Sequence, residues 1–103
     1  MRAITVTQTG AGSTDAIPCD LHISPFNLGL GCVVDGTVNF TIQHTFDDIF
    51  DADVTPTWFD HPVLQSLTAN TDGNYAFPVR AIRATVNSGA GSVTLTMIQA
   101  GLA

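Results

Sequence analysis

The sequence contains no lysine and no glutamate. Its charged side chains are three arginines and nine aspartates, which make up 12% of the 103 residues and give a net charge of −6. That share is about half of what globular proteins usually carry. Three arginines are too few to neutralise the phosphates of a nucleic acid, and an acidic chain is repelled by an anionic membrane. We therefore expect neither nucleic acid nor a membrane as a partner.

The sequence also lacks a long apolar run. Its first residues do not resemble a secretory signal, and no later segment is long enough to span a bilayer. We expect a soluble protein made in the cytoplasm, where disulfides are rare. The two cysteines, Cys19 and Cys32, are accordingly expected to be small buried thiols.

The residues that are present favour strands and turns. Threonine, valine, isoleucine, phenylalanine, glycine and aspartate are abundant, whereas the good surface helix formers lysine and glutamate are absent. Apolar and polar side chains alternate along most of the chain, which is the pattern of half-buried strands. The clearest case is residues 37–44, where Val38, Phe40 and Ile42 fall on one face.

Short turn signals between these runs predict three hairpins, over residues 4–21, 28–44 and 82–99. Asp35–Gly36 is a two-residue signal for a type I′ turn in the second hairpin. The tetrapeptide Gly-Ala-Gly-Ser, at 10–13 and again at 89–92, is expected to turn the other two. About seven or eight short strands with such turns indicate an all-β fold, an antiparallel β-sandwich with a jelly roll as one form. We expect one domain over residues 1–103.

Residues 46–62 have no regular pattern. They contain five of the nine aspartates, together with Phe50, Trp58 and Phe59. A structureless connection of this length is uncommon in a compact domain and is more often functional than idle. Because large aromatic side chains contribute disproportionately to interfaces, Phe50, Trp58 and Phe59 are the predicted partner-binding residues. The alternative is that this connection folds over an open end of the sandwich and uses both Trp58 and Phe59 to cap it.

The sequence predicts no metal, no cofactor and no enzymatic activity. His44 and His61 flank the aspartates, but the calcium and zinc ligand spacings do not occur, and aspartates in such a segment favour caps and Asx-turns over a calcium site. No histidine or cysteine lies in the sequence context of a catalytic nucleophile or base.

Three stretches of the chain resemble a known class of proteins. They are residues 38–48, residues 72–83 and the run Ser-Gly-Ala-Gly-Ser-Val-Thr-Leu-Thr at 88–96. They resemble small virion structural proteins encoded in the head gene clusters of tailed bacteriophages, a resemblance that covers most of the chain. It implies a capsid decoration or cement protein, which binds and stabilises the capsid shell. The implied partners are the major capsid protein or other virion proteins and further copies of the chain, and the implied location is the virion, assembled in the host cytoplasm.

Two alternatives stay open. One is a virion component of the same fold in the neck, the tail or the base of a fibre. The other is a calcium- or carbohydrate-binding β-sandwich module that uses the aspartate-rich segment 46–62 with Trp58.

Overall fold

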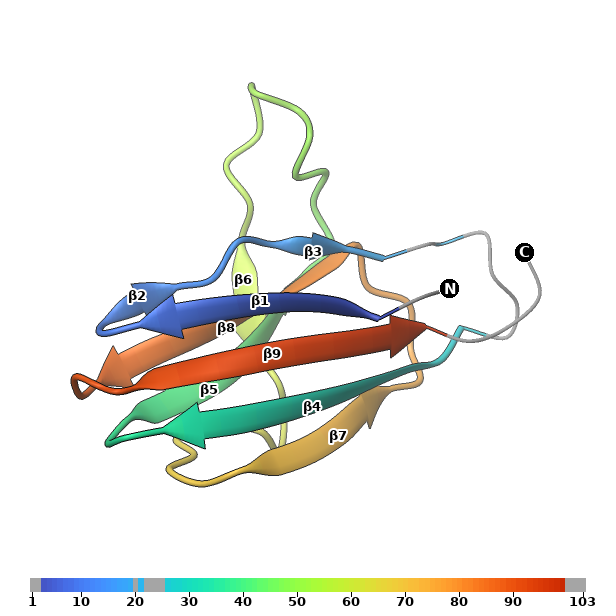
Figure 1. Ribbon diagram of the computed structural model, residues 1–103. Coiled ribbons are helices and arrows are strands. Elements are labelled where there is room, and N and C mark those ends of the chain that lie inside the picture. The colour runs from blue at the N-terminus through green and yellow to red at the C-terminus, as the bar shows by residue number, and fades with distance from the viewer. Residues whose placement is uncertain (1–2, 20, 22–25, 100–103) are drawn as a thin grey trace.

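The computed structural model describes residues 3–19, 21 and 26–99 (Figure 1). In these ranges the secondary structure consists of strands, and no helix is long and apolar enough to cross a membrane. The strands are β1 (Ile4–Thr9), β2 (Gly12–Ser13), β3 (Ile17–Pro18), β4 (Leu28–Asp35), β5 (Asn39–Thr45), β6 (Trp58–Asp60), β7 (Thr71–Tyr75), β8 (Ala81–Ser88) and β9 (Ser92–Gln99).

The strands form two antiparallel sheets that pack as a sandwich. One sheet has the order β1-β9-β4-β7, and the other has the order β2-β8-β5-β6, with β3 also paired to β8. This is the strand order of a jelly roll, so the expected fold class is confirmed. There are nine strands in the described ranges because β2 and β3 are two short pieces that pair with the same strand. Thr14, between them, stays bound to β8, since its N–H donates to the Ala84 carbonyl at 2.9 Å.

Both sheets contribute alternate residues to one hydrophobic core. In β4, for example, Leu28, Leu30 and Cys32 are buried while Gly29 and Val33 are exposed. The core side chains from the other long strands are Phe40, Ile42, Ile82, Ala84, Val86, Val93, Leu95 and Met97. The alternation in the sequence therefore predicted correctly which residues of these strands face inward.

The three predicted hairpins do not form. β4 and β5, joined by Asp35–Gly36, lie in different sheets, and so do β8 and β9. β1 pairs with β9, while β2 and β3, which follow β1 in the chain, pair with β8. Each predicted turn instead carries the chain across the sandwich from one sheet to the other. Alternation of apolar and polar residues cannot distinguish a hairpin within one sheet from a turn that joins the two sheets. In both arrangements, each strand buries every second side chain.

The three crossings meet at one end of the sandwich (Figure 1). The Gly10 N–H donates to the Gly91 carbonyl at 2.9 Å, and the Gly91 N–H donates to the Thr37 carbonyl at 2.9 Å. Gly36 and Gly89 have φ angles of 84° and 101°, which glycine adopts readily. The two Gly-Ala-Gly-Ser segments thus lie side by side.

Two further segments differ from the sequence-based expectation. Residues 71–74 have the sequence Thr-Asp-Gly-Asn, which is typical of a turn, but they belong to β7 and pair with β4. The irregular segment 46–62 contains β6, which pairs with β5 at Gln43, His44 and Thr45. In β7, pairing with β4 holds residues of weak strand propensity in an extended backbone. In β6, pairing with β5 does the same for a segment of only three residues.

Candidate partner-binding surface

Residues 46–57, which we call the finger, project away from the sandwich between β5 and β6 (Figure 1). The base of the finger is closed by Asp47, whose Oδ2 accepts the Thr57 N–H at 2.7 Å. An exposed ion pair of 3.9 Å joins Asp48 to Arg80 beside it. The segment therefore does not fold over the sandwich, contrary to the capping alternative.

The aspartates of the finger organise its backbone. Asp48 Oδ1 accepts the Phe50 N–H at 2.9 Å, and Asp51 Oδ1 accepts the Asp53 N–H at 2.9 Å. These are consecutive Asx-turns, as the turn interpretation of the aspartates predicted. In the described part of the chain, no three His, Cys, Asp or Glu side chains are placed to hold a metal ion.

Phe50 is the most exposed large apolar side chain of the finger. Its exposed fraction is 79%, and Val54 on the same finger is also exposed. Isolated exposed apolar residues are common, but one presented on a projecting loop with fixed turns is available for contact without rearrangement.

Trp58 and Phe59 point to opposite faces of β6, as adjacent strand residues must. Trp58 is half-buried on the outer face, where the guanidinium carbon of Arg83 lies 4.1 Å from its ring centroid. Phe59 pairs with His44 of β5 and points to the inner side of the sheet, yet it remains 49% exposed because it lies at the edge of the sandwich. Neither residue is part of the core.

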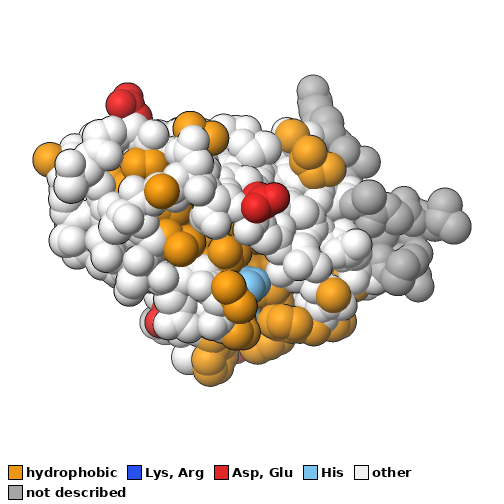
Figure 2. All heavy atoms as spheres, turned by 90° about the horizontal axis from the view of Figure 1, so that it is seen from below, with side chains coloured by type: hydrophobic (Ala, Val, Ile, Leu, Met, Phe, Trp, Pro, Cys, Tyr) orange, Lys and Arg blue, Asp and Glu red, His pale blue; other side chains and the backbone are white. Residues whose placement is uncertain are grey.

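Phe59 belongs to a group of aromatic side chains that we call the aromatic end: Phe46, Phe59 and Phe77 around His44 and Tyr75. The ring centroid of His44 lies 5.5 Å from Phe46, 5.9 Å from Phe59 and 5.5 Å from Phe77. The three phenylalanines are 53%, 49% and 42% exposed, whereas His44 and Tyr75 are buried. Figure 2, which views the molecule from below Figure 1, shows hydrophobic side chains gathered beside a histidine.

The polar atoms beneath the phenylalanines are hydrogen-bonded. His44 Nδ1 lies 2.9 Å from the Tyr75 hydroxyl. Burial lowers the pKa of His44, and the neighbouring His61 lowers this pKa further, against a smaller opposite effect of Asp60. Burial raises the pKa of Tyr75 above its ordinary range. At neutral pH both groups are therefore uncharged, and this end of the molecule presents an apolar surface over a neutral interior.

Sequence reasoning found Phe59 but missed the rest of the aromatic end. Phe46, Phe77 and Tyr75 are separated in the sequence, and they meet only because β5 and β7 lie at the same side of the two sheets. The only available signal was the pair of aromatic residues, Tyr75 and Phe77, that follows a turn-like segment. Phe50 and Trp58 lie outside this group.

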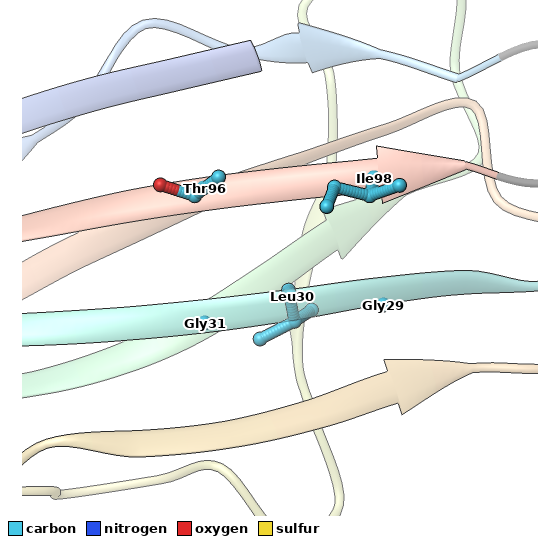
Figure 3. Close-up of a pocket in the computed structure, with 5 residues that line it drawn as sticks. All are labelled: Gly29, Leu30, Gly31, Thr96 and Ile98. Atoms are coloured by element: carbon cyan, nitrogen blue, oxygen red, sulfur yellow. The ribbon is translucent and has the colours of Figure 1, made fainter. Parts of the chain in front are cut away.

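A separate apolar hollow of about 320 Å³ lies on the outer face of the first sheet (Figure 3). Gly29 and Gly31 of β4 form its floor, because a Cβ atom at either position would meet only open space. Thr96 and Ile98 of β9 flank it, and Leu30 contributes from β4. The described residues that line the hollow are glycine, leucine, threonine and isoleucine, so they offer mainly apolar contact.

The two cysteines are free thiols. Cys32 is buried and Cys19 is half-buried, and burial raises the pKa of each thiol to about 12. Both are therefore poor nucleophiles at neutral pH. His22, the third histidine, lies outside the described residues.

Comparison with known proteins gives a likeness in fold. No protein-family model matches the sequence, and no curated protein matches it. The structure is similar to a chain in a solved structure from Bacillus, described by the words "Bacillus endospore appendages form a novel family of disulfide-linked pili". The TM-score is 0.53 with 13% sequence identity, and the match covers 99% of this chain and 87% of the other. The two proteins share a β-sandwich fold.

Proposed function

We propose that this protein is a structural component of a phage virion that decorates the capsid and stabilises the shell through protein–protein contacts. The proposal combines the resemblance of three sequence stretches to small virion proteins with a jelly-roll fold, an architecture also used by viral capsid proteins. The observation that carries it is the exposure of Phe46, Phe50, Phe59 and Phe77 on one rigid domain. Such side chains are typical anchors of protein interfaces.

Attachment to a shell of repeated subunits does not require a large interface on each copy. Weak contacts suffice when several copies bind at the same time, because the effective concentration of the later contacts is high. The finger supplies a projecting apolar residue, Phe50, among four aspartates, and this charge favours a basic surface on the partner. The aromatic end supplies a second apolar contact.

The test is to locate the chain in purified particles of the virus that encodes it. We expect it to co-purify with virions and to give density on the capsid surface in an electron-microscopy map. Particles freed of the protein should rebind the wild type, while Phe50→Ser and Phe59→Ser should rebind at least about tenfold more weakly. Val33→Ser is the matched control, since Val33 is an exposed apolar residue on the outer face of β4. Absence of the chain from purified virions would contradict the proposal.

A second candidate is a component of a fibre or of its base. It is favoured by the fold likeness to a chain from a structure of pili. The same particle map separates the two candidates, because density at the neck, tail or fibre base supports the second. The calcium- or carbohydrate-binding alternative has less support. Asp48 and Asp51 already accept backbone N–H groups, and Arg83 covers one face of Trp58.

A further inference from the structure

The strands at the borders of the two sheets are protected from further pairing to very different degrees. β2 and β3 have two residues each, and β3 ends in Pro18, which has no N–H. β6 has three residues and ends in Asp60. Short edge strands, proline and charge are common protections against pairing with another chain.

The edge of β7 is protected by a neighbouring segment. His61 Nε2 lies 3.1 Å from the carbonyl oxygen of Asn74 in β7. An additional strand at β7 would have to displace this contact.

β1 has none of these protections. Its six residues, Ile-Thr-Val-Thr-Gln-Thr, include no charge and no proline. Its pairing with β9 runs without a bulge from Ile4↔Met97 to Thr9↔Ser92. In the described part of the chain, no strand pairs with its other edge.

The register shows which backbone groups of β1 face this open edge. The Gly10 N–H donates to the Gly91 carbonyl, so Gly10 and Gly91 form a hydrogen-bonded pair directly after the β1–β9 ladder. Hydrogen-bonded and non-hydrogen-bonded pairs alternate in an antiparallel ladder. Ile4, Val6 and Gln8 are therefore bonded to β9.

Thr5, Thr7 and Thr9 point their N–H and C=O groups away from β9. Side chains approach most closely in non-hydrogen-bonded pairs. The hydroxyl of Thr5 lies 3.1 Å from that of Thr96, and the hydroxyl of Thr7 lies 3.0 Å from that of Thr94, in agreement with this assignment.

We propose that β1 pairs antiparallel with β1 of a second copy, across a two-fold axis at Thr7. In this register Thr7 faces Thr7 of the second copy, and Thr5 faces its Thr9, so every outward N–H and C=O of the three threonines finds a partner. The Thr9 carbonyl, which accepts the Gln8 side-chain amide at 3.3 Å, exchanges this bond for one from the second copy. The pairing joins the two β1-β9-β4-β7 sheets into one continuous sheet and gives further cover to the half-buried Ile4 and Val6.

A second copy fits this edge better than an unrelated strand. The interface is self-complementary, as a two-fold contact requires, because one uncharged strand supplies both sides in matching length and phase. The net charge of −6 opposes association of two copies, but β1 itself carries no charged side chain. The inference goes beyond the proposed attachment to a shell, since it uses a different border of the molecule and stands without it.

The test is the mass of the protein in solution as a function of concentration, by light scattering or sedimentation. We expect wild type to pass from 10.8 kDa towards twice this mass at micromolar to millimolar concentrations. Thr7→Pro should weaken dimerisation at least about tenfold, since it removes the N–H at the axis from both copies while leaving the β1–β9 bonds in place. Thr7→Val, which keeps the N–H, is the matched control and should dimerise. A monomeric wild type, or a Thr7→Pro variant that dimerises as well as wild type, would overturn the proposal.

A measurement on wild type covers the case in which Thr7→Pro does not fold. Amide hydrogen exchange at low and high concentration should show added protection at Thr5, Thr7 and Thr9, with no change in β7. Protection that does not depend on concentration, or that appears in β7 instead, would contradict pairing through β1.

Discussion

At the scale of single residues, two histidines meet on the buried ring of Tyr75. The centroid of the His61 ring lies 4.8 Å from that of Tyr75, and the centroid of His44 lies 5.1 Å away on another side. His61 Nδ1 accepts the N–H groups of Val63 and Leu64 at 3.0 and 3.1 Å, which leaves Nε2 to donate to Asn74. These three contacts fix the orientation of the His61 ring against Tyr75.

This arrangement predicts a protein that is destabilised by mild acid. The pKa of His44 is lowered from 6.5 by burial and by His61, so the unfolded chain binds a proton at pH values where the folded chain does not. The free energy of unfolding should therefore fall as the pH drops below about 6.5. Urea titrations between pH 7.5 and 5 measure this dependence.

Substitution of His44 tests whether this residue causes the pH dependence of the free energy of unfolding. His44→Phe should make the dependence shallower, while it lowers stability at pH 7.5 by about 1–3 kcal/mol because the Tyr75 hydroxyl loses its partner. If the variant kept the slope of wild type, His44 would not be the group that titrates.

The end of the sandwich where the three turns between the sheets meet gives a second prediction at this scale. A Cβ atom at Gly91 would lie 2.5 Å from the Asp35 carbonyl oxygen and 2.7 Å from the Thr37 nitrogen, both backbone atoms. Gly91→Ala should destabilise the fold by about 1–3 kcal/mol or more. Gly31→Ala is the matched control, because a Cβ there meets nothing within 4 Å, and it should change stability by less than about 0.5 kcal/mol. Thermal unfolding of the two variants checks this, and equal stabilities would contradict the crowding at the crossing.

Residue patterns predicted burial better than they predicted contacts. The inward faces of β4 and β5 follow from alternation alone, and so do the opposite directions of Trp58 and Phe59. The meeting of His44 and His61 could not be predicted in this way. Each histidine has an ordinary local sequence, and only the packing of β5, β7 and the segment after β6 brings them to one tyrosine.

At the scale of elements, the sequence indicated the long strands but assigned them the wrong partners. A hairpin and a crossing between sheets both need a short turn between two alternating runs, and Asp35–Gly36 is suited to either. The deciding interactions are non-local. β1 and β9 pair from opposite ends of the chain, and β5 pairs with β8 rather than with β4.

The finger is an element whose removal should leave the sandwich intact. Its internal bonds are local turns and the closing bond between Asp47 and Thr57. Its contacts to the body are the packing of Phe46 on His44 and Phe59, the Asp47 N–H bond to the Thr45 hydroxyl, and the exposed pair of Asp48 with Arg80. Of these contacts only the exposed pair involves residues 48–54, and exposed pairs contribute at most about 1 kcal/mol. Replacement of residues 48–54 by a short glycine–serine linker should shift the thermal midpoint by less than about 5 °C.

Removal of residues 62–67 gives the contrasting control. Leu64 and Leu67 supply backbone bonds of 2.9 Å to Ile42 and Phe40, at the edge of β5. Deletion of this segment should therefore unfold the domain. Calorimetry of both variants is the measurement, and a finger replacement that unfolds the domain would show that the finger supports the core.

At the scale of the whole molecule, the two borders of the sandwich have different chemistry. The border with β6 and β7 carries the finger and the aromatic end, which suit contact with a different protein. The border with β1 carries an uncharged open edge, which suits a second copy. No residue of β1 belongs to the finger or to the aromatic end, so a dimer paired through β1 would present two aromatic ends to a repeating partner.

The state of the two cysteines distinguishes the proposed pairing through β1 from assembly through disulfide bonds. The structural neighbour comes from pili described as disulfide-linked, whereas Cys32 is buried here and the pKa of both thiols is raised to about 12 by burial. A thiol that is protonated at neutral pH attacks a second sulfur slowly. We therefore expect any dimer to dissociate fully in detergent gels without reductant, and the unfolding midpoint to be the same with and without dithiothreitol. A covalent dimer in the absence of reductant, lost on reduction and in Cys19→Ser, would show instead that Cys19 becomes accessible and links the copies.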